Sequence, residues 1–142
     1  MKVLIFGLPG SGKTTLAREL AYAFRVPHYN ADVMREYYDD WDMNMSGRIR
    51  QASRMFGVEY GIMDFVCPMD AMREGDYKIW MNTIEKSKYG DTNRIFEEST
   101  NHDLEIKEWI DLNQLRNSLA DSNPGIKGIR SYLSEHLPKL VK

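Results

Sequence analysis

Apolar residues along the chain predict strands that alternate with helices. The apolar run at residues 3–6 is closed by a glycine, as expected for a buried strand. After it, Leu16, Leu20 and Phe24 recur at every fourth position, which predicts an amphipathic helix that ends before Pro27. Further strands are expected at residues 28–30, 61–66, 77–81 and 103–106. This alternation predicts an α/β fold with a mainly parallel sheet flanked by helices.

A second region of helical pattern covers residues 46–57. Ser46 is expected to be its N-cap and Gly57 its C-terminal stop. One face is predicted to pack, and it carries Ile49, Ala52, Ser53 and Phe56. The other face is polar and carries Arg48, Gln51 and Arg54. A shorter helix is expected at residues 33–38.

The remaining segments are a long connection and a C-terminal helix. Residues 85–101 are polar and irregular, and we expect them to form a functional loop that acts as a lid. Asn123 and Pro124 open a predicted helix that ends at Pro138. Residues 1–142 suit one compact domain with a single core.

The most specific motif directly follows the first predicted strand. Residues 7–14 read Gly-Leu-Pro-Gly-Ser-Gly-Lys-Thr and match G-x-x-x-x-G-K-[ST], the P-loop or Walker A pattern. Its glycines let the backbone wrap closely around an oxyanion, and the helix that follows adds its positive end. We expect ATP here, with Lys13 in a catalytic role at the β- and γ-phosphates and the Thr14 hydroxyl on Mg²⁺. The predicted nucleotide-binding residues are Gly7, Pro9, Gly10, Ser11, Gly12, Lys13, Thr14 and Thr15.

Composition narrows the classes of function. The formal net charge of -2 argues against a general nucleic-acid binder. The N-terminal apolar run is too short for a membrane span or a signal peptide, and the single cysteine excludes an internal disulfide, so a cytoplasmic location is expected. The sequence lacks the Asn-Lys-x-Asp motif with which GTPases recognise guanine. Two classes remain: a kinase for a small acceptor, and a nucleotide-binding module without turnover.

An acid and an arginine follow the second predicted strand. Asp32 lies at the sheet edge where ligands of open α/β folds bind, so it could orient an acceptor hydroxyl or accept its proton. Arg35 comes three residues later on the same helical face and is suited to an anionic acceptor. The alternative is structural, with Asp32 stabilising the start of its own helix and Arg35 solvated. We hypothesise that Asp32 is catalytic and that Arg35 binds substrate.

Three stretches of the chain resemble the adenylylsulfate kinase (APS kinase) family. Residues 7–17 are close to that family's P-loop. Residues 30–35 (Asn-Ala-Asp-Val-Met-Arg) are similar to its Asp-Gly-Asp-x-x-Arg segment, and residues 65–68 (Phe-Val-Cys-Pro) to its Phe-Ile-Ser-Pro strand end. A fourth stretch, residues 96–104, looks like the end of the family's lid. The likeness spans most of residues 3–106 in the right order.

The resemblance implies transfer of the ATP γ-phosphate to the ribose 3′-hydroxyl of adenylylsulfate. It would assign Asp32 to that hydroxyl, Arg35 to an anionic group of the acceptor, and Arg48 or Arg50 to a further acceptor contact. It also makes a homodimer reasonable. The chain departs from the family at Asn30, which replaces the first acid, and in the lid, where an arginine-rich portion is missing. The alternatives are a polynucleotide or nucleoside kinase and a non-catalytic ATP-binding regulatory module.

Some residues admit both a functional and a structural interpretation. Asp64 could hold Mg²⁺ through water, but its position in the middle of the predicted strand 61–66 favours a structural hydrogen bond. Trp41, Met43 and Tyr89 could stack on an adenine, although packing is the more usual role of such side chains.

The same holds for charged residues and for residues that could bind a metal. Cationic side chains of the predicted lid could close over phosphates; they are Lys86, Lys88 and Arg94. An acidic run is expected to be solvated and comprises Asp39, Asp40 and Asp42. The histidines share no ligand spacing, so no metal site beyond Mg²⁺ is expected; they are His28, His102 and His136. Cys67 is expected to pack in the core.

Overall fold

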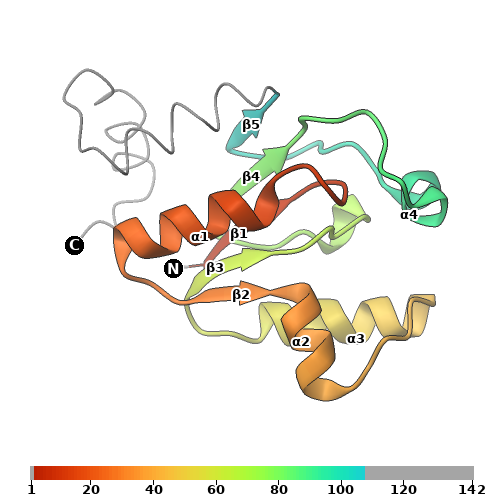
Figure 1. Ribbon diagram of the computed structural model, residues 1–142, viewed down its shortest axis with the longest axis horizontal. Helices are drawn as coiled ribbons and strands as arrows, with labels where there is room; N and C mark the ends of the chain where they lie inside the picture. The colour runs from red at the N-terminus through yellow and green to blue at the C-terminus, as the bar shows by residue number, and fades with distance from the viewer. Residues whose placement is uncertain (1, 108–142) are drawn as a thin grey trace.

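The computed structural model describes residues 2–107, except for the side chains of residues 23 and 24. Within this part, five parallel strands form one sheet in the order β2-β3-β1-β4-β5 (Figure 1). The strands are β1 (Lys2–Phe6), β2 (His28–Asn30), β3 (Gly61–Asp64), β4 (Tyr77–Met81) and β5 (Leu104–Ile106). The predicted α/β fold with a parallel sheet is therefore confirmed.

The central strand β1 is buried on both faces of the sheet. Because alternate residues of a strand point to opposite faces, a strand that is covered on both sides is apolar throughout. One face packs beneath α1 (Lys13–Phe24), and its core includes Val3, Ile5, Leu16, Leu20, Ile62 and Ile79. The opposite face has a second core that includes Leu4, Phe6, Met55, Met63 and Trp80.

Three further α-helices follow α1 within the described residues. Helices α2 (Ala31–Tyr38) and α3 (Met45–Phe56) lie side by side near the β2 edge (Figure 1). The short helix α4 (Gly90–Ile95) belongs to the long connection between β4 and β5, and the 3-10 turn η1 (Asp70–Met72) lies between β3 and β4. No helix within residues 2–107 has the length and hydropathy that a bilayer crossing requires.

The structure confirms some predicted boundaries and corrects others. Strands β2 and β4 cover the predicted residues, and Gly57 is the C-cap residue of α3. Strand β3 is shorter than predicted, because it ends at Asp64 and not at residue 66. The N-cap of α3 is Asn44 and not Ser46, whose hydroxyl instead donates to Asp42 (3.3 Å).

The packing face predicted for α3 is wrong in part, although two of its members, Ala52 and Phe56, pack as expected. Ala52 and Met55 are buried, whereas Ile49 is 51% exposed. The side of α3 that carries Ala52 also carries two polar residues, Arg48 and Gln51. Both line a cavity. The hydrophobic pattern identified another face because part of the true one carries polar residues.

Residues 85–101 are not wholly irregular, because α4 forms within them. The helix predicted from Pro124 lies outside the described residues.

The side chain of Arg73 bonds to both the connection after β3 and the segment after α4. Its side chain is 1% exposed, forms an ion pair with Asp70 (3.1 Å), and lies against the rings of Phe6 and Phe96. Its guanidinium donates to three carbonyl oxygens, those of Cys67 (2.8 Å), Pro68 (3.1 Å) and Glu97 (2.6 Å). The Pro68 carbonyl also accepts from the Glu97 N–H (2.8 Å), so Arg73 adds to a backbone hydrogen bond between the two connections.

We expect Arg73→Ala to lower the free energy of unfolding by about 3–5 kcal/mol, because it removes the ion pair with Asp70 and three hydrogen bonds to backbone carbonyls and creates a cavity. Denaturant unfolding followed by circular dichroism measures this change. Arg94→Ala is the matched control, since Arg94 is exposed and, among residues 2–107, its ion pair is with Asp91 of the same helix. A loss in Arg73→Ala no larger than in the control would contradict the role assigned to this side chain.

Candidate functional site

The loop between β1 and α1 has a conformation that requires glycine. Gly12 has a φ of 101°, and Gly7 has a φ of 153°. A Cβ atom on Gly7 would lie 2.5 Å from the carbonyl oxygen of Met81. A hydrogen bond from the Ser11 N–H to the Leu8 carbonyl (3.1 Å) closes the loop. The N-terminus of α1 follows directly, and such a loop before a helix N-terminus is a phosphate-binding arrangement.

Lys13 is a buried cation at this helix N-terminus. It is 8% exposed, and its Nζ donates to the Leu8 carbonyl of its own loop (2.9 Å). Burial lowers the pKa of Lys13 to about 8, while the nearby carboxylates of Asp64 and Asp32 act in the opposite direction. A phosphate at the loop would favour the charged form of this lysine further.

Asp64 joins three elements of the site. It is 1% exposed and accepts hydrogen bonds from the Thr14 hydroxyl (3.1 Å) and the Asn30 side-chain amide (3.1 and 3.2 Å). Its second oxygen contacts Nε2 of His28. The expectation that Asp64 lies mid-strand is therefore wrong, because β3 ends at this residue and its carboxylate faces the P-loop threonine. His28 likewise belongs to the site, contrary to the sequence-based expectation that it stands alone.

The chemistry of these groups fits Mg²⁺. This ion prefers oxygen ligands, keeps several waters, and takes few groups from the protein beside the phosphates of a nucleotide. The Thr14 hydroxyl and the Asp64 carboxylate lie together at the start of α1. In addition, the buried hydroxyl of Ser11 has no hydrogen-bond partner within residues 2–107. Thr14 could ligate Mg²⁺ directly, and Asp64 could hold one of its waters.

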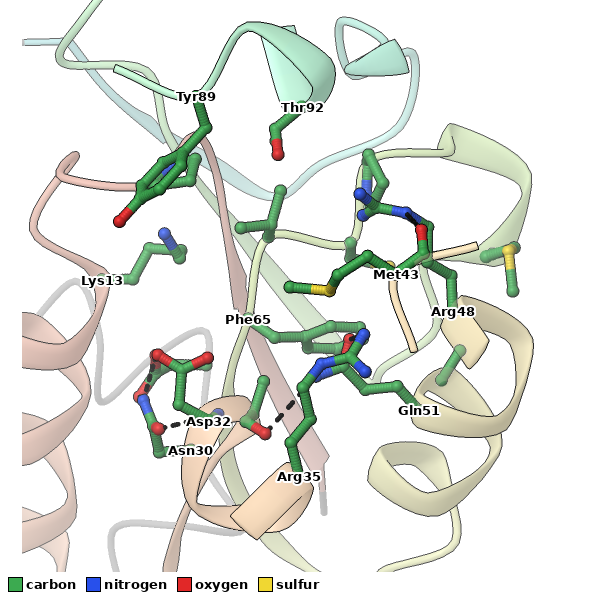
Figure 2. Close-up of a pocket in the computed structure, with 18 of the residues that line it drawn as sticks. Lys13, Asn30, Asp32, Arg35, Met43, Arg48, Gln51, Phe65, Tyr89 and Thr92 are labelled. Atoms are coloured by element: carbon green, nitrogen blue, oxygen red, sulfur yellow. Dashed lines mark hydrogen bonds between the residues drawn. The ribbon is translucent and has the colours of Figure 1, made fainter. Parts of the chain in front are cut away.

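A cavity of about 460 Å³ opens beside the P-loop (Figure 2). Figure 2 shows Lys13 and Asp32 on one side of this cavity and Arg48 and Gln51 on the other. Its floor comes from the segment after β3, residues 65–69. Residues from three separate stretches that resemble APS kinases, 7–17, 30–35 and 65–68, thus line one cavity.

The two arginines predicted to bind substrate differ in what they contact. Arg35 is 3% exposed, and its guanidinium donates to Gln51 (2.9 Å) and to the carbonyls of Asp40 (3.0 Å) and Asp42 (3.1 Å). Burial and the neighbouring Arg48 lower the pKa of Arg35. The structural alternative, in which Arg35 is solvated, is wrong: Arg35 is buried, lines the cavity and donates to carbonyls of the loop between α2 and α3.

Arg48 is the better placed of the two candidate arginines of α3. It lines the cavity, and within the described residues only its Nε donates a hydrogen bond, to the Met43 carbonyl (2.8 Å). Arg50 instead forms ion pairs with Asp40 (2.8 Å) and Asp42 (3.1 Å), and these hydrogen bonds hold the pKa of Asp40 far below its usual range. The acidic run is therefore not simply solvated, since two of its members pair with α3.

Aromatic and apolar side chains form the outer rim of the cavity. They are each about half exposed and comprise Trp41 (53%), Met43 (54%) and Tyr89 (51%). The cationic residues predicted to close over phosphates do not line the cavity. Among them, Lys88 lies over the Tyr89 ring (5.3 Å) and Arg94 pairs with Asp91.

Cys67 packs as predicted. It is 2% exposed, and burial raises the pKa of its thiol to about 12.

Sequence reasoning missed the roles of His28 and Gln51. His28 and Asn30 are two residues apart on β2, so their side chains point to the same face, and Asn30 is the register partner of Asp64. The strand period could have grouped His28 with Asn30. It could not have shown that Asp64 lies beside them, because strand order is not readable from the pattern.

The fold and the loop define a P-loop NTPase-type α/β protein, a class that generally binds ATP with Mg²⁺. A family model described as an AAA domain matches residues 6–55. No curated protein matches the sequence.

Solved structures share the fold. APE1195 is 21% identical with a TM-score of 0.62, over 100% of this chain and 96% of that chain. Shikimate kinase from Aquifex aeolicus is 11% identical with a TM-score of 0.53, over 75% of this chain and 86% of that chain. A candidate kinase from Chloroflexus aurantiacus is 14% identical with a TM-score of 0.51, over 97% and 96% of the two chains. At these identities the similarity concerns the fold, which this chain shares with kinases.

The pKa of Lys13 predicts how nucleotide affinity depends on pH. Bound phosphates raise this pKa above about 8, so binding takes up a proton at higher pH, and ATP affinity should fall about tenfold between pH 7 and pH 9. Calorimetry of ATP binding at both pH values measures the change. Lys13→Ala should bind ATP about tenfold to a hundredfold more weakly at pH 7 and lose most of the pH dependence. An equal pH dependence in the two proteins would contradict the assignment.

Proposed function

We propose that this chain is an ATP-dependent small-molecule kinase whose acceptor is an anionic alcohol, with adenylylsulfate the first candidate. One observation carries the proposal: a single cavity is lined by Lys13 of the P-loop, by the carboxylate of Asp32 and by Arg48. A donor phosphate at the loop and an acceptor in the cavity would therefore be neighbours. A module that only binds ATP needs no space for an acceptor beside the P-loop.

The reaction requires positioning and charge neutralisation. The acceptor oxygen forms a bond to the γ-phosphorus while the bond to the bridging oxygen breaks, so that ADP leaves. Lys13 neutralises charge on the β- and γ-phosphates, and bound Mg²⁺ would add further charge at Thr14 and Asp64. Asp32 lies in the first turn of α2 with its side chain exposed to the cavity, where it can orient the hydroxyl and take its proton.

The cavity chemistry supports an acceptor with an anionic group and a flat apolar part. Arg48 has guanidinium nitrogens left to bind an anion after its contact with Met43. The rim carries Trp41 and Tyr89, on which an adenine could stack. Adenylylsulfate has both features and a ribose hydroxyl, in line with the sequence resemblance to APS kinases.

Asp32→Asn should lower kcat by about 10²–10⁴-fold, because the amide cannot take the acceptor proton. ATP affinity should change much less than kcat, because the proposed roles of Asp32 act mainly in the transition state. The assay is ADP release with adenylylsulfate, with nucleosides and with a 5′-hydroxyl oligonucleotide. Asp39→Asn is the matched control, because Asp39 is an exposed acid at the other end of α2 and does not line the cavity.

The acceptor panel separates the proposal from its alternatives. Turnover with the oligonucleotide or a nucleoside alone would assign the chain to those kinases and keep Asp32 in its role. Tight ATP binding without turnover on any acceptor would favour the regulatory module. Full activity of Asp32→Asn would refute the mechanism.

Arg48→Ala should raise the acceptor KM about tenfold to a hundredfold, since it removes a charge-assisted hydrogen bond. Arg50→Ala is the paired variant on the same helix and should leave this KM near wild type, because Arg50 pairs with Asp40 and Asp42 and does not line the cavity. Steady-state kinetics with varied acceptor distinguishes them. A larger effect at Arg50 than at Arg48 would reverse the assignment.

A further inference from the structure

His28 contacts the candidate magnesium site through Asp64. It begins β2, an edge strand, and its side chain is 20% exposed. Its register partner is Ile62, two residues before Asp64, so its Nε2 reaches Asp64 diagonally across the strand pair. Within the described residues, His28 is not part of the cavity wall. It can therefore influence the site through Asp64 without contacting an acceptor there.

The two oxygens of Asp64 have different partners. Oδ1 accepts from the Thr14 hydroxyl (3.1 Å), and Oδ2 contacts Nε2 of His28. The amide of Asn30 lies nearly equidistant from both oxygens (3.1 and 3.2 Å), so this contact alone does not distinguish them. A carboxylate oxygen accepts hydrogen bonds, and an imidazole N–H of His28 can donate one to Oδ2. The imidazole thus contacts the carboxylate oxygen that does not accept from Thr14.

We propose that His28 is a positioning residue that orients the Asp64 carboxylate toward Thr14 and thereby tightens magnesium-dependent nucleotide binding. The proposal rests on the nucleotide site of the proposed function. Mutation of outer-shell side chains at metal sites commonly changes metal affinity about tenfold or more. The effect of His28 should accordingly appear only when Mg²⁺ is present.

The test is ADP binding by calorimetry, with Mg²⁺ and with EDTA. His28→Val keeps strand propensity but removes the donor, and it should weaken Mg²⁺-dependent ADP binding about tenfold while binding in EDTA stays unchanged. His28→Gln retains an N–H donor and should recover most of the lost affinity. His102→Val is the matched control, because His102 contacts Ser99 and Glu105 and lies outside the cavity wall.

A double-mutant cycle tests whether His28 acts through Asp64. In an Asp64→Asn background, His28→Val should cause no further loss of Mg²⁺-dependent affinity. Equal losses with Mg²⁺ and with EDTA, or additive losses in the cycle, would overturn the inference and leave the proposed function intact. Wild-type protein that binds no ADP under either condition would overturn both.

If His28→Val does not fold, a measurement on the wild-type protein tests the same inference. Mn²⁺ with ADP should broaden the ring resonances of His28 more strongly than those of His102. Unbroadened His28 signals in a protein that binds Mn²⁺ and ADP would overturn the inference.

Discussion

The buried carboxylate of Asp64 sets the geometry of this site. An ionised acid at 1% exposure is tolerated only if donors surround it, and here the donors come from α1, through Thr14, and from both polar residues of β2. Asn30 links Asp64 to α2. Its amide donates to Asp64, while its Oδ1 accepts from the N–H groups of Asp32 and Val33. The same side chain thus joins the P-loop helix to the first turn of α2. These hydrogen bonds help to fix the position of Asp32 relative to Lys13.

Two buried arginines stabilise the cavity walls in a similar way. Arg35 satisfies carbonyls of the loop between α2 and α3, and Arg73 satisfies carbonyls after β3 and after α4. These connections have no regular ladder, so their backbone oxygens need side-chain donors. A planar guanidinium with five donors suits this task better than an ammonium group. Arg48 differs because, in the part of the chain that the structure describes, only its Nε donates, so its other donors remain available at the cavity.

The sequence predicted the fold and the P-loop well because both depend on local patterns. An apolar run, a Gly-rich loop and a periodic helix lie next to one another in the chain, and β1, the loop and α1 occur where this order indicates. The error at Asp64 arose because the end of a short strand is set by pairing with its neighbours. The error in α3 arose because Arg48 and Gln51 share the buried side with Ala52. Contacts between distant segments, such as Arg73 with Glu97, leave no periodic signal at all.

The departure at Asn30 from the APS kinase pattern has a physical explanation in the sheet. Asn30 and Asp64 are register partners on β2 and β3, so an acid at both positions would bring two carboxylates together at a buried site. The amide at residue 30 removes that repulsion and donates to the acid instead. One carboxylate therefore remains at the P-loop threonine, supplied by the neighbouring strand. Asp32 is exposed just after the end of β2, and it stays available for an acceptor. The site therefore has one buried acid beside the P-loop threonine and one exposed acid at the cavity.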